Sequence, residues 1–407
     1  MLARLTAAAV FGVDAVPVSV EVDVSPGLPG LTMVGLPDAT VRESRDRVRT
    51  AIRNSGFPFP SQRITVSLAP ADVRKVGAAF DLPIALGILA ASGVLPHREP
   101  ARYTVVGGLS LDGAVPPMRG LLPIAVSARD TDGALIFPAF NTAEAAIVSD
   151  LKLFPVRSLM DATRVLLSSA PQAHVPERAP PPAVLASAED LSDVHGQLAG
   201  RRALELAAAG AHHLLLCGPP GAGKTMLARR MAGILPPLTL DEALVVTTIH
   251  SVAGQLENGR GLIQERPFRA PHHTCSDVAL VGGGASPRPG ELSLAHGGVL
   301  FLDELPEFNR RVLESLRQPL EQGVVHIARA SRSVEFPARV MLVAAMNPCP
   351  CGYFGSNQRV CVCPLPVVDR YRRRLSGPLR DRFDLSLELP AIHHLRSGEK
   401  MVYRRLS

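Results

Sequence analysis

The chain has 407 residues, enough for two or three domains with cores of their own. Its composition, 46% hydrophobic and 20% charged, suits an ordinary globular protein, and no apolar run reaches the roughly 18 residues of a membrane-spanning helix. The formal charge of +6 permits contact with nucleic acid but fits a basic solvated surface equally well, and without tryptophan an aromatic base-stacking platform is not expected to dominate such contact.

The N-terminal part predicts a mixture of strands and helices, an α+β domain. A short apolar stretch after Arg4 faintly resembles a signal peptide, but Asp14 ends it and Val18–Val24 alternates as a strand does. We therefore interpret the stretch as the first strand of a domain and the protein as cytoplasmic. Further elements are expected in chain order: a helix at Asp38–Asn54, a strand at Arg63–Leu68, a buried helix at Ala79–Ala91 and a strand at Tyr103–Leu109.

A proline-rich segment, Ala170–Ala183, has no hydrophobic periodicity and predicts a stiff interdomain linker. We expect a first domain at residues 1–168, a linker at 169–186, a second domain at 187–392 and a tail at 393–407. The second domain alternates apolar strands with helices, the pattern of a parallel α/β sheet. Its strands are expected at Leu214–Cys217, Val299–Leu302, Val340–Ala345 and Leu385–Leu389.

The first of these strands leads into a phosphate-binding loop. Residues Gly218–Thr225 fit G-x-x-x-x-G-K-[ST], and a helix is expected to follow at Met226–Ala232. Backbone N–H groups of such a loop, and the N-terminus of its helix, surround phosphate oxygens. Lys224 can reach the β- and γ-phosphates of ATP, and the Thr225 hydroxyl can bind Mg²⁺. The residues expected to contact the nucleotide are Gly218, Pro219, Pro220, Gly221, Ala222, Gly223, Lys224, Thr225 and Met226.

Two acidic residues follow the strand Val299–Leu302. Asp303 is expected to bind Mg²⁺, directly or through water, and Glu304 to act as the general base that polarises the attacking water. By itself an apolar run that ends in Asp-Glu is usually a strand that meets a loop. The preceding phosphate-binding loop favours the catalytic interpretation.

Two further candidates lie nearer the C-terminus. Asn347 follows the strand Val340–Ala345 and can orient the water or sense the γ-phosphate, although without the other motifs it would be an ordinary strand cap. Arg380 and Arg382 lie in the segment Ser376–Asp384. An arginine placed against a neighbour's γ-phosphate stabilises the transition state, but on the residues alone either arginine fits a surface position equally well.

Four of the six cysteines form two close pairs, Cys349 with Cys351 and Cys361 with Cys363. This spacing suits a tetrahedral Cys₄ zinc site, which would be structural because four thiolates leave no open coordination position. Disulfides are the alternative, which a reducing cytoplasm disfavours. The two isolated cysteines are expected to be inert: Cys217 and Cys275.

Several groups of arginines can line a phosphate-binding channel, although most such runs are solvated faces, and the sequence leaves both interpretations open. We expect no metal site at the neighbouring His272 and His273, because adjacent side chains are expected to diverge. The groups are Arg266 with Arg269, Arg329 with Arg332 in the turn of a hairpin expected between Val324–Ile327 and Val334–Phe336, and Arg370 with Arg372, Arg373 and Arg374.

Together these motifs resemble the YifB/ComM family of Mg-chelatase-like AAA+ ATPases. The resemblance rests on the phosphate-binding loop, on Val299–Glu304, on the Asn347-Pro-Cys-Pro-Cys-Gly run and on Ser376–Asp384. It covers nearly the whole chain through Ser25-Pro-Gly-Leu-Pro-Gly, Val34-Gly-Leu-Pro-Asp, Phe80-Asp-Leu-Pro-Ile-Ala-Leu, Arg269-Ala-Pro-His-His-Thr and Gly290-Glu-Leu-Ser-Leu-Ala-His.

The resemblance implies a Lon-protease-like N-terminal domain (ribosomal S5 domain 2-like) joined to an AAA+ ATPase domain of the helix-2-insert type. It implies ATP and Mg²⁺ as ligands, a homo-hexamer, and for the ComM branch a helicase or branch-migration activity on single-stranded or branched DNA in natural transformation and recombination. It places a trans-acting arginine finger at Arg382, a sensor at Asn347, and pore loops near Arg269–His273 and Arg329–Arg332.

Two departures from the family pattern change what is expected. A Lon-type peptidase needs a serine nucleophile and a lysine base, but Ala79 and Leu122 occupy the matching positions, so we expect no peptidase activity. The family continues into a helical lid with a second sensor arginine, and the tail at 393–407 is expected to be a truncated lid, which would weaken hexamer assembly and turnover. Two other functions stay open: a chelatase-like ATPase that remodels a protein or metal-insertion partner, and an ATP-binding module without turnover.

Overall fold

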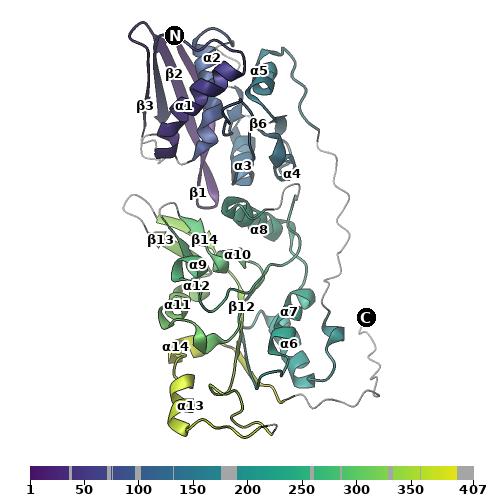
Figure 1. Ribbon diagram of the computed structural model, residues 1–407. Coiled ribbons are helices and arrows are strands. Elements are labelled where there is room, and N and C mark those ends of the chain that lie inside the picture. Colours follow the sequence, from purple (N-terminus) through teal and green to yellow (C-terminus); the bar gives the residue numbers. More distant parts are fainter. Residues whose placement is uncertain are drawn as a thin grey trace. The chain divides into compact units, whose positions relative to one another are not determined.

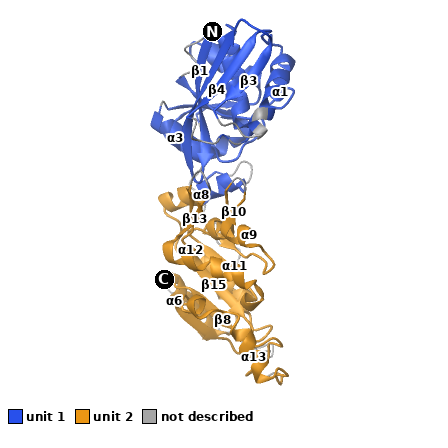
Figure 2. Cartoon of the chain, turned by 90° about the vertical axis from the view of Figure 1, so that its left-hand side faces the viewer, with its two compact units in different colours: residues 1–179, 247–263 blue, residues 180–246, 264–407 orange. Residues whose placement is uncertain are grey.

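The computed structural model describes the chain except residues 36–38, 71–74, 76, 97–101, 132, 176–189, 257–260, 285–286, 329–332, 358 and 392–407. The chain divides into two compact units (Figure 2). Unit 1 comprises Met1–Ala179 and Thr247–Ile263, and unit 2 comprises Pro180–Val246 and Gln264–Ser407. The expected tail at 393–407, the turn residues Arg329 and Arg332, and most of the expected linker lie outside the described residues.

Unit 1 is built on a mixed seven-stranded sheet in the order β3-β4-β2-β1-β5-β6-β7. β1 (Leu2–Phe11) pairs antiparallel with β2 (Asp14–Ser25), which confirms the expected first strand. Alternate residues of β2, among them Val18, Val20 and Val22, are fully buried because successive side chains of a strand point to opposite faces. The other strands are β3 (Gly30–Val34), β4 (Arg63–Ala69), β5 (Thr104–Val105), β6 (Ala134–Pro138) and β7 (Lys152–Val156).

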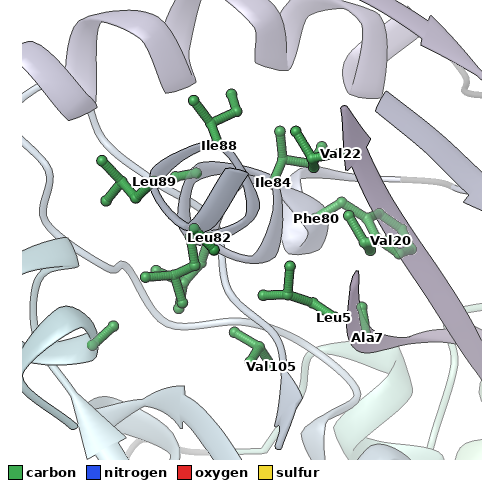
Figure 3. Close-up of a cluster of buried hydrophobic side chains, with 14 of the residues drawn as sticks. Leu5, Ala7, Val20, Val22, Phe80, Leu82, Ile84, Ile88, Leu89 and Val105 are labelled. Atoms are coloured by element: carbon green, nitrogen blue, oxygen red, sulfur yellow. The ribbon is translucent and has the colours of Figure 1, made fainter. Parts of the chain in front are cut away.

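The core of unit 1 surrounds α2 (Asp81–Ala91), in which every residue is buried. A helix that is apolar on all sides must be enclosed, and α2 packs against β1, β2, α1 and α5. Figure 3 shows Leu82, Ile84, Ile88 and Leu89 of this helix among side chains of β1, β2 and β5. The remaining helices of the unit's N-terminal part are α1 (Ala39–Asn54), α3 (Leu121–Thr131), α4 (Thr142–Ala145) and α5 (Leu159–Leu167).

The strand expected at Tyr103–Leu109 is shorter than the sequence suggests. Only Thr104–Val105 pairs in the sheet. After it, the backbone bonds to the start of the α2 region: the N–H of Gly107 donates to the carbonyl of Ala79 at 2.9 Å, and its own carbonyl accepts from the N–H of Leu82 at 3.0 Å. Apolar residues therefore continue beyond the point where the sheet pairing ends.

Residues 247–263 belong to unit 1, although they lie far along the sequence. They include the last part of α8 (Leu240–Ala253). The buried carboxylate of Glu144 accepts from the Ser251 hydroxyl, and it also accepts from the Leu122 N–H at 2.8 Å and the Asn141 amide at 2.9 Å. These bonds satisfy a carboxylate that would be costly to bury alone.

Unit 2 contains a parallel five-stranded sheet in the order β16-β8-β15-β12-β9. β8 (Leu214–Cys217) and β12 (Val299–Leu302) coincide with the expected strands. β15 (Met341–Met346) is displaced by one residue from the expected bounds, and β16 ends at Glu388. β15 lies between β8 and β12, so the residues that follow these three strands meet at one edge of the sheet. The fifth strand is β9 (Phe268–Arg269).

Helices and two small hairpins complete unit 2 (Figure 1). The expected hairpin is confirmed, because β13 (Val324–Ala328) pairs antiparallel with β14 (Ser333–Pro337). A second hairpin joins β10 (Gly282–Gly283) to β11 (Arg288–Pro289). The helices are α6 (Leu198–Gly210), α7 (Lys224–Ile234), α9 (Asp277–Val281), α10 (Glu291–Leu294), α11 (Arg310–Ser315), α12 (Arg317–Gln322), α13 (Leu365–Arg372) and α14 (Gly377–Arg380). Within the described ranges no helix combines the length and the apolar character needed to cross a bilayer.

Candidate nucleotide-binding site

The phosphate-binding loop joins β8 to α7, as the sequence predicts. The residues of β8 up to Leu216 are buried, and α7 begins at Lys224. Gly221 and Gly223 have φ of 76° and 83°, a left-handed backbone that favours glycine. These two conformations wrap the loop around the N-terminus of α7, where free N–H groups and the helix dipole favour an anion.

The Lys224 ammonium lies inside this loop. Its Nζ donates to the carbonyls of Gly218 at 2.7 Å and Pro219 at 3.0 Å, and to Oδ1 of Asn347 at 3.1 Å. Burial lowers the pKa of Lys224, and the nearby charge of Asp303 opposes that shift. The ammonium is thus held by neutral oxygens that a phosphate can replace.

Thr225 and Asp303 are in direct contact. The Thr225 hydroxyl donates to Oδ2 of Asp303 at 2.7 Å. Thr225 lies in the first turn of α7 and Asp303 directly follows β12, so the contact results from parallel strands whose carboxyl ends share one edge. A hydroxyl and a carboxylate are hard oxygen ligands of the kind Mg²⁺ prefers, and their side-by-side position fits such an ion.

Glu304 occupies an uncommon backbone conformation beside this pair. Its φ is 51°, in the left-handed region, and its N–H donates to Oδ1 of Asp303 at 2.9 Å. A non-glycine residue in this region is strained and often marks a functional position. The Glu304 side chain is 55% exposed, and Oε2 lies 3.3 Å from Nδ1 of His273.

His273 is a site residue that the sequence interpretation missed. The sequence predicts no metal site at His272 and His273, and the family resemblance places His273 near a pore loop, but neither expectation pairs it with Glu304. The expectation that the two side chains diverge is wrong, because their ring centroids lie 4.1 Å apart. Its contact with Glu304 arises because β9, which precedes it, pairs in parallel with β12 through Arg269 and Leu300. The position of a histidine a few residues beyond the strand adjacent to β12 is the signal that could have identified it. The His273 ring also contacts the edge of Phe308, at 6.4 Å between centroids.

Arg382 lies at the opposite edge of the sheet. It precedes β16, whose first residue Leu385 pairs with Leu214, the first residue of β8. A four-residue strand spans roughly 13 Å, and this length separates the Arg382 edge from the loop edge. The guanidinium of Arg382 forms an ion pair with Glu321. The structure therefore brings together Lys224, Thr225, Asp303, Glu304 and Asn347, but not Arg382.

The four paired cysteines converge in space. All four Sγ atoms lie within 4.8 Å of one another. Sγ of Cys349 is 3.4 Å from that of Cys351 and 3.7 Å from that of Cys361, and Cys351 is 3.6 Å from Cys361. A tetrahedron with Zn–S bonds of about 2.3 Å has edges of about 3.8 Å, so the sulfur spacing fits zinc. The other partner in the second pair is Cys363.

Most described arginines of the predicted basic groups have partners in the same chain. Arg269 makes a two-point contact with Glu291 at 2.6 and 2.8 Å, and Arg266 lies 3.3 Å from Glu242. Arg374 contacts Glu307 at 2.9 Å. Arg370 and Arg373 are exposed on and after α13. The exposed pair is thus better placed than Arg266 or Arg269 to meet phosphate groups from outside.

The chain matches two family models and several known proteins. Residues 190–396 match a family model described as magnesium chelatase, subunit ChlI, and residues 20–141 match a second model, subunit ChlI of Mg-chelatase. YifB of Salmonella typhimurium is 48% identical over 391 residues, which cover 96% of this chain and 76% of that protein. Competence protein ComM of Haemophilus influenzae is 47% identical over 395 residues, covering 96% and 77%.

A third relative is a protease. Lon protease 2 of Bacillus subtilis is 30% identical over 161 residues, covering 36% of this chain and 28% of that protein. This likeness and the mixed sheet of unit 1 are consistent with the Lon-like fold expected for the N-terminal part. On the long matches to YifB and ComM, the chain belongs to the YifB/ComM family of Mg-chelatase-like AAA+ ATPases.

Proposed function

We propose that the chain is a motor that hydrolyses ATP and moves along DNA. The observation that carries the hydrolytic part is the contact between Thr225 and Asp303 at 2.7 Å, next to the ammonium of Lys224. Two segments far apart in the sequence, the start of α7 and the residues after β12, thereby provide a phosphate-binding cation, a pair of magnesium ligands and an adjacent carboxylate. This set suits transfer of a phosphoryl group to water better than nucleotide binding alone.

Each residue has a distinct part in the proposed reaction. Lys224 exchanges its carbonyl partners for the β- and γ-phosphate oxygens, and Thr225 and Asp303 hold Mg²⁺, which neutralises the developing charge when bound. Glu304 accepts a proton from the attacking water as its oxygen bonds to the γ-phosphorus and ADP leaves. Asn347 orients that water or contacts the γ-phosphate. Phosphate and ADP are the products.

Arg382 completes the site only in an assembly. Its position beyond the amino end of β8 and β16 prevents it from reaching the nucleotide bound to its own chain. This separation supports a role in which Arg382 leaves Glu321 and stabilises the transition state in a second copy. A ring of six copies would give every site an arginine from its neighbour. Hexamer formation is measured by light scattering with and without ATP.

Three observations support the proposal that the motor acts on DNA. They are the similarity to a competence protein, the net charge of +6 and the exposed arginines on and after α13. The test is the rate of phosphate release with and without single-stranded DNA. Stimulation by DNA supports the motor. Turnover that DNA does not change would favour a chelatase-like ATPase acting on a protein or metal-insertion partner, and binding without turnover would leave only a nucleotide-binding module.

Unit 1 is proposed to serve a role other than proteolysis. Ala79 and Leu122, at the positions matching the Lon nucleophile and base, carry no reactive group, and Leu122 is fully buried. Absence of cleavage of an unfolded protein substrate, with active Lon protease as the positive control, is the expected result. Cleavage that persists in the purified protein would contradict it.

We propose that the four clustered cysteines bind zinc. It would be structural, because four thiolates fill a tetrahedral site. Metal analysis under reducing conditions should find one zinc ion per chain. Cys361→Ser should lose it, whereas Cys275→Ser, outside the cluster, should keep it. A metal-free purified protein, or two variants with the same zinc content, would contradict the assignment.

A further inference from the structure

A glycine of the cysteine loop, defined as residues Cys349–Cys363, packs against the phosphate-binding loop. Gly352 has φ of 85°, and its N–H donates to the Cys349 carbonyl at 2.9 Å. A Cβ atom at this position would lie 2.6 Å from Cδ and 2.8 Å from Cγ of Pro220. Carbon atoms in contact prefer separations of about 3.5–4.0 Å, so the two loops are packed too closely for any other residue.

The same loop is tied to the sensor asparagine. Cys349 lies two residues after Asn347 and is fully buried. The intervening Pro348 carbonyl accepts from Nε of Arg372 at 3.2 Å. The Arg372 guanidinium also lies 5.1 Å from the ring centroid of Phe354, whose N–H donates to Sγ of Cys349 at 3.3 Å. The backbone after Asn347 is therefore held by Arg372, which also contacts Phe354, a residue bonded to the cysteine cluster.

A metal ion in this cluster would link these contacts to the nucleotide site. The two cysteine pairs come from the two ends of the loop, and an ion bound by all four sulfurs would close it. Closing the loop holds Gly352 against Pro220 on one side and Asn347 against Lys224 on the other. Without a bound metal ion, the free thiols of the four cysteines do not bond the two ends of the loop together.

From these contacts we propose that the cysteine loop positions the ATP site, with Gly352 as the contact that transmits the metal state of the cluster to the phosphate-binding loop. Gly352 is a positioning residue, because it acts through Pro220 and does not reach the phosphates. The proposal rests on the proposed ATP site. It adds that affinity for nucleotide depends on the metal bound by the four cysteines.

The chain provides a matched pair of variants. Gly352 and Gly355 lie in the same loop with φ of 85° and 74°, but a Cβ at Gly355 would meet nothing within 4 Å. Both alanine variants carry similar backbone strain, and only Gly352→Ala pushes against Pro220. Loss of one hydrogen bond to a charged phosphate corresponds to about tenfold or more in affinity, so Gly352→Ala should weaken binding of a fluorescent ADP analogue about tenfold or more. Gly355→Ala should bind as the parent does.

A second variant separates the contact from a general loss of structure. Pro220→Ala removes the ring atoms that the new methyl group would meet, so the double variant Gly352→Ala/Pro220→Ala should bind ADP more tightly than Gly352→Ala alone. Non-additivity of this kind reports a direct interaction between the two positions. Zinc content is measured for every variant and should be equal in all of them.

Metal removal tests the other half of the proposal. The parent protein, freed of zinc by a chelator under reducing conditions and returned to Mg²⁺, should show the same loss of ADP affinity as Gly352→Ala, and added zinc should restore it. Equal binding by the two glycine variants, no rescue by Pro220→Ala, or unchanged affinity in the zinc-free protein would overturn the proposal. Because binding is the readout, a parent protein without turnover would refute the proposed ATPase function and leave this test intact.

Discussion

The side-chain amide of Asn347 and the ammonium of Lys224 are joined by a 3.1 Å hydrogen bond, although 123 positions separate them in the chain. β15 lies beside β8 in the parallel sheet, so the residues that follow the two strands lie side by side. Asn347 and Lys224 thus form one hydrogen-bonded group in the chain. Arrival of the γ-phosphate would change the partners of both.

Lys224→Ala tests the phosphate-binding assignment. Removal of the ammonium eliminates the cation that faces the β- and γ-phosphates, and we expect a fall in turnover of at least about a hundredfold. Calorimetric titration with ADP and ATP measures whether binding is lost as well. A variant that hydrolyses ATP at the parent rate would refute the site.

Glu304→Gln separates binding from chemistry. Glutamine has the shape of glutamate but cannot accept the proton of the attacking water, so ATP should bind with parent affinity and remain unhydrolysed. Loss of a general base slows a reaction by about 10²–10⁴-fold. Single-turnover release of radiolabelled phosphate measures the step. Undiminished release would assign the base elsewhere.

His273→Ala examines the residue that contacts the proposed base. Nδ1 of His273 lies 3.3 Å from Oε2 of Glu304, so its loss should let the carboxylate leave its position. We expect kcat to fall about tenfold with KM for ATP unchanged, because the base is misplaced and the phosphate contacts remain.

His272→Ala is the control for that variant. The ring of His272 is tilted by 33° against that of His273, with 4.1 Å between their centroids, and its Nδ1 bonds to the hydroxyl of Thr274 instead of to Glu304. It should keep most of the parent kcat. If both variants lose the same activity, packing of the two rings matters and the Glu304 contact does not.

His296 should make unit 2 sensitive to acid. Burial, with help from the Arg339 charge, lowers its pKa to about 4 from 6.5, and its Nδ1 accepts from the Arg339 N–H at 3.0 Å. The unfolded chain therefore binds this proton more readily than the folded one. The stability that neutral His296 contributes to the folded state is present above pH 6.5 and declines as the pH falls toward 4. Between pH 7 and pH 5, protonation of this histidine should lower the free energy of unfolding by about 2 kcal/mol.

Urea unfolding of the parent and of His296→Asn at pH 7 and pH 5 measures this loss. Asparagine can accept the same hydrogen bond through Oδ1 but has no proton to gain. The variant should lose less stability than the parent on acidification. An equal loss in both proteins would assign the acid sensitivity to other groups.

In unit 1, hydrophobic patterns in the sequence predict some elements correctly and miss others. The alternation of Val18, Val20 and Val22 and the apolar helix Asp81–Ala91 were predictable, because period and hydrophobicity act locally. The end of β5 at Val105 was not, because it depends on hydrogen bonds from Gly107 to the start of α2. The sequence also could not predict that residues 247–263 belong to unit 1, because this results from contacts such as that of Ser251 with Glu144.

The residue types of the candidate site, and the local structure of each, follow from the sequence alone. The glycines, Lys224 and Thr225 stand in one short motif, and Asp303, Glu304 and Asn347 each end an apolar strand, so their types and local structure follow from neighbours in the chain. Which of these residues meet depends on the fold. Strand order placed Asn347 between the loop and the acidic pair and set His273 against Glu304 and Gly352 against Pro220. Arg382 lies at the far end of the sheet because it precedes a parallel strand. Propensity and periodicity act over a few residues, whereas these contacts depend on how distant segments pack.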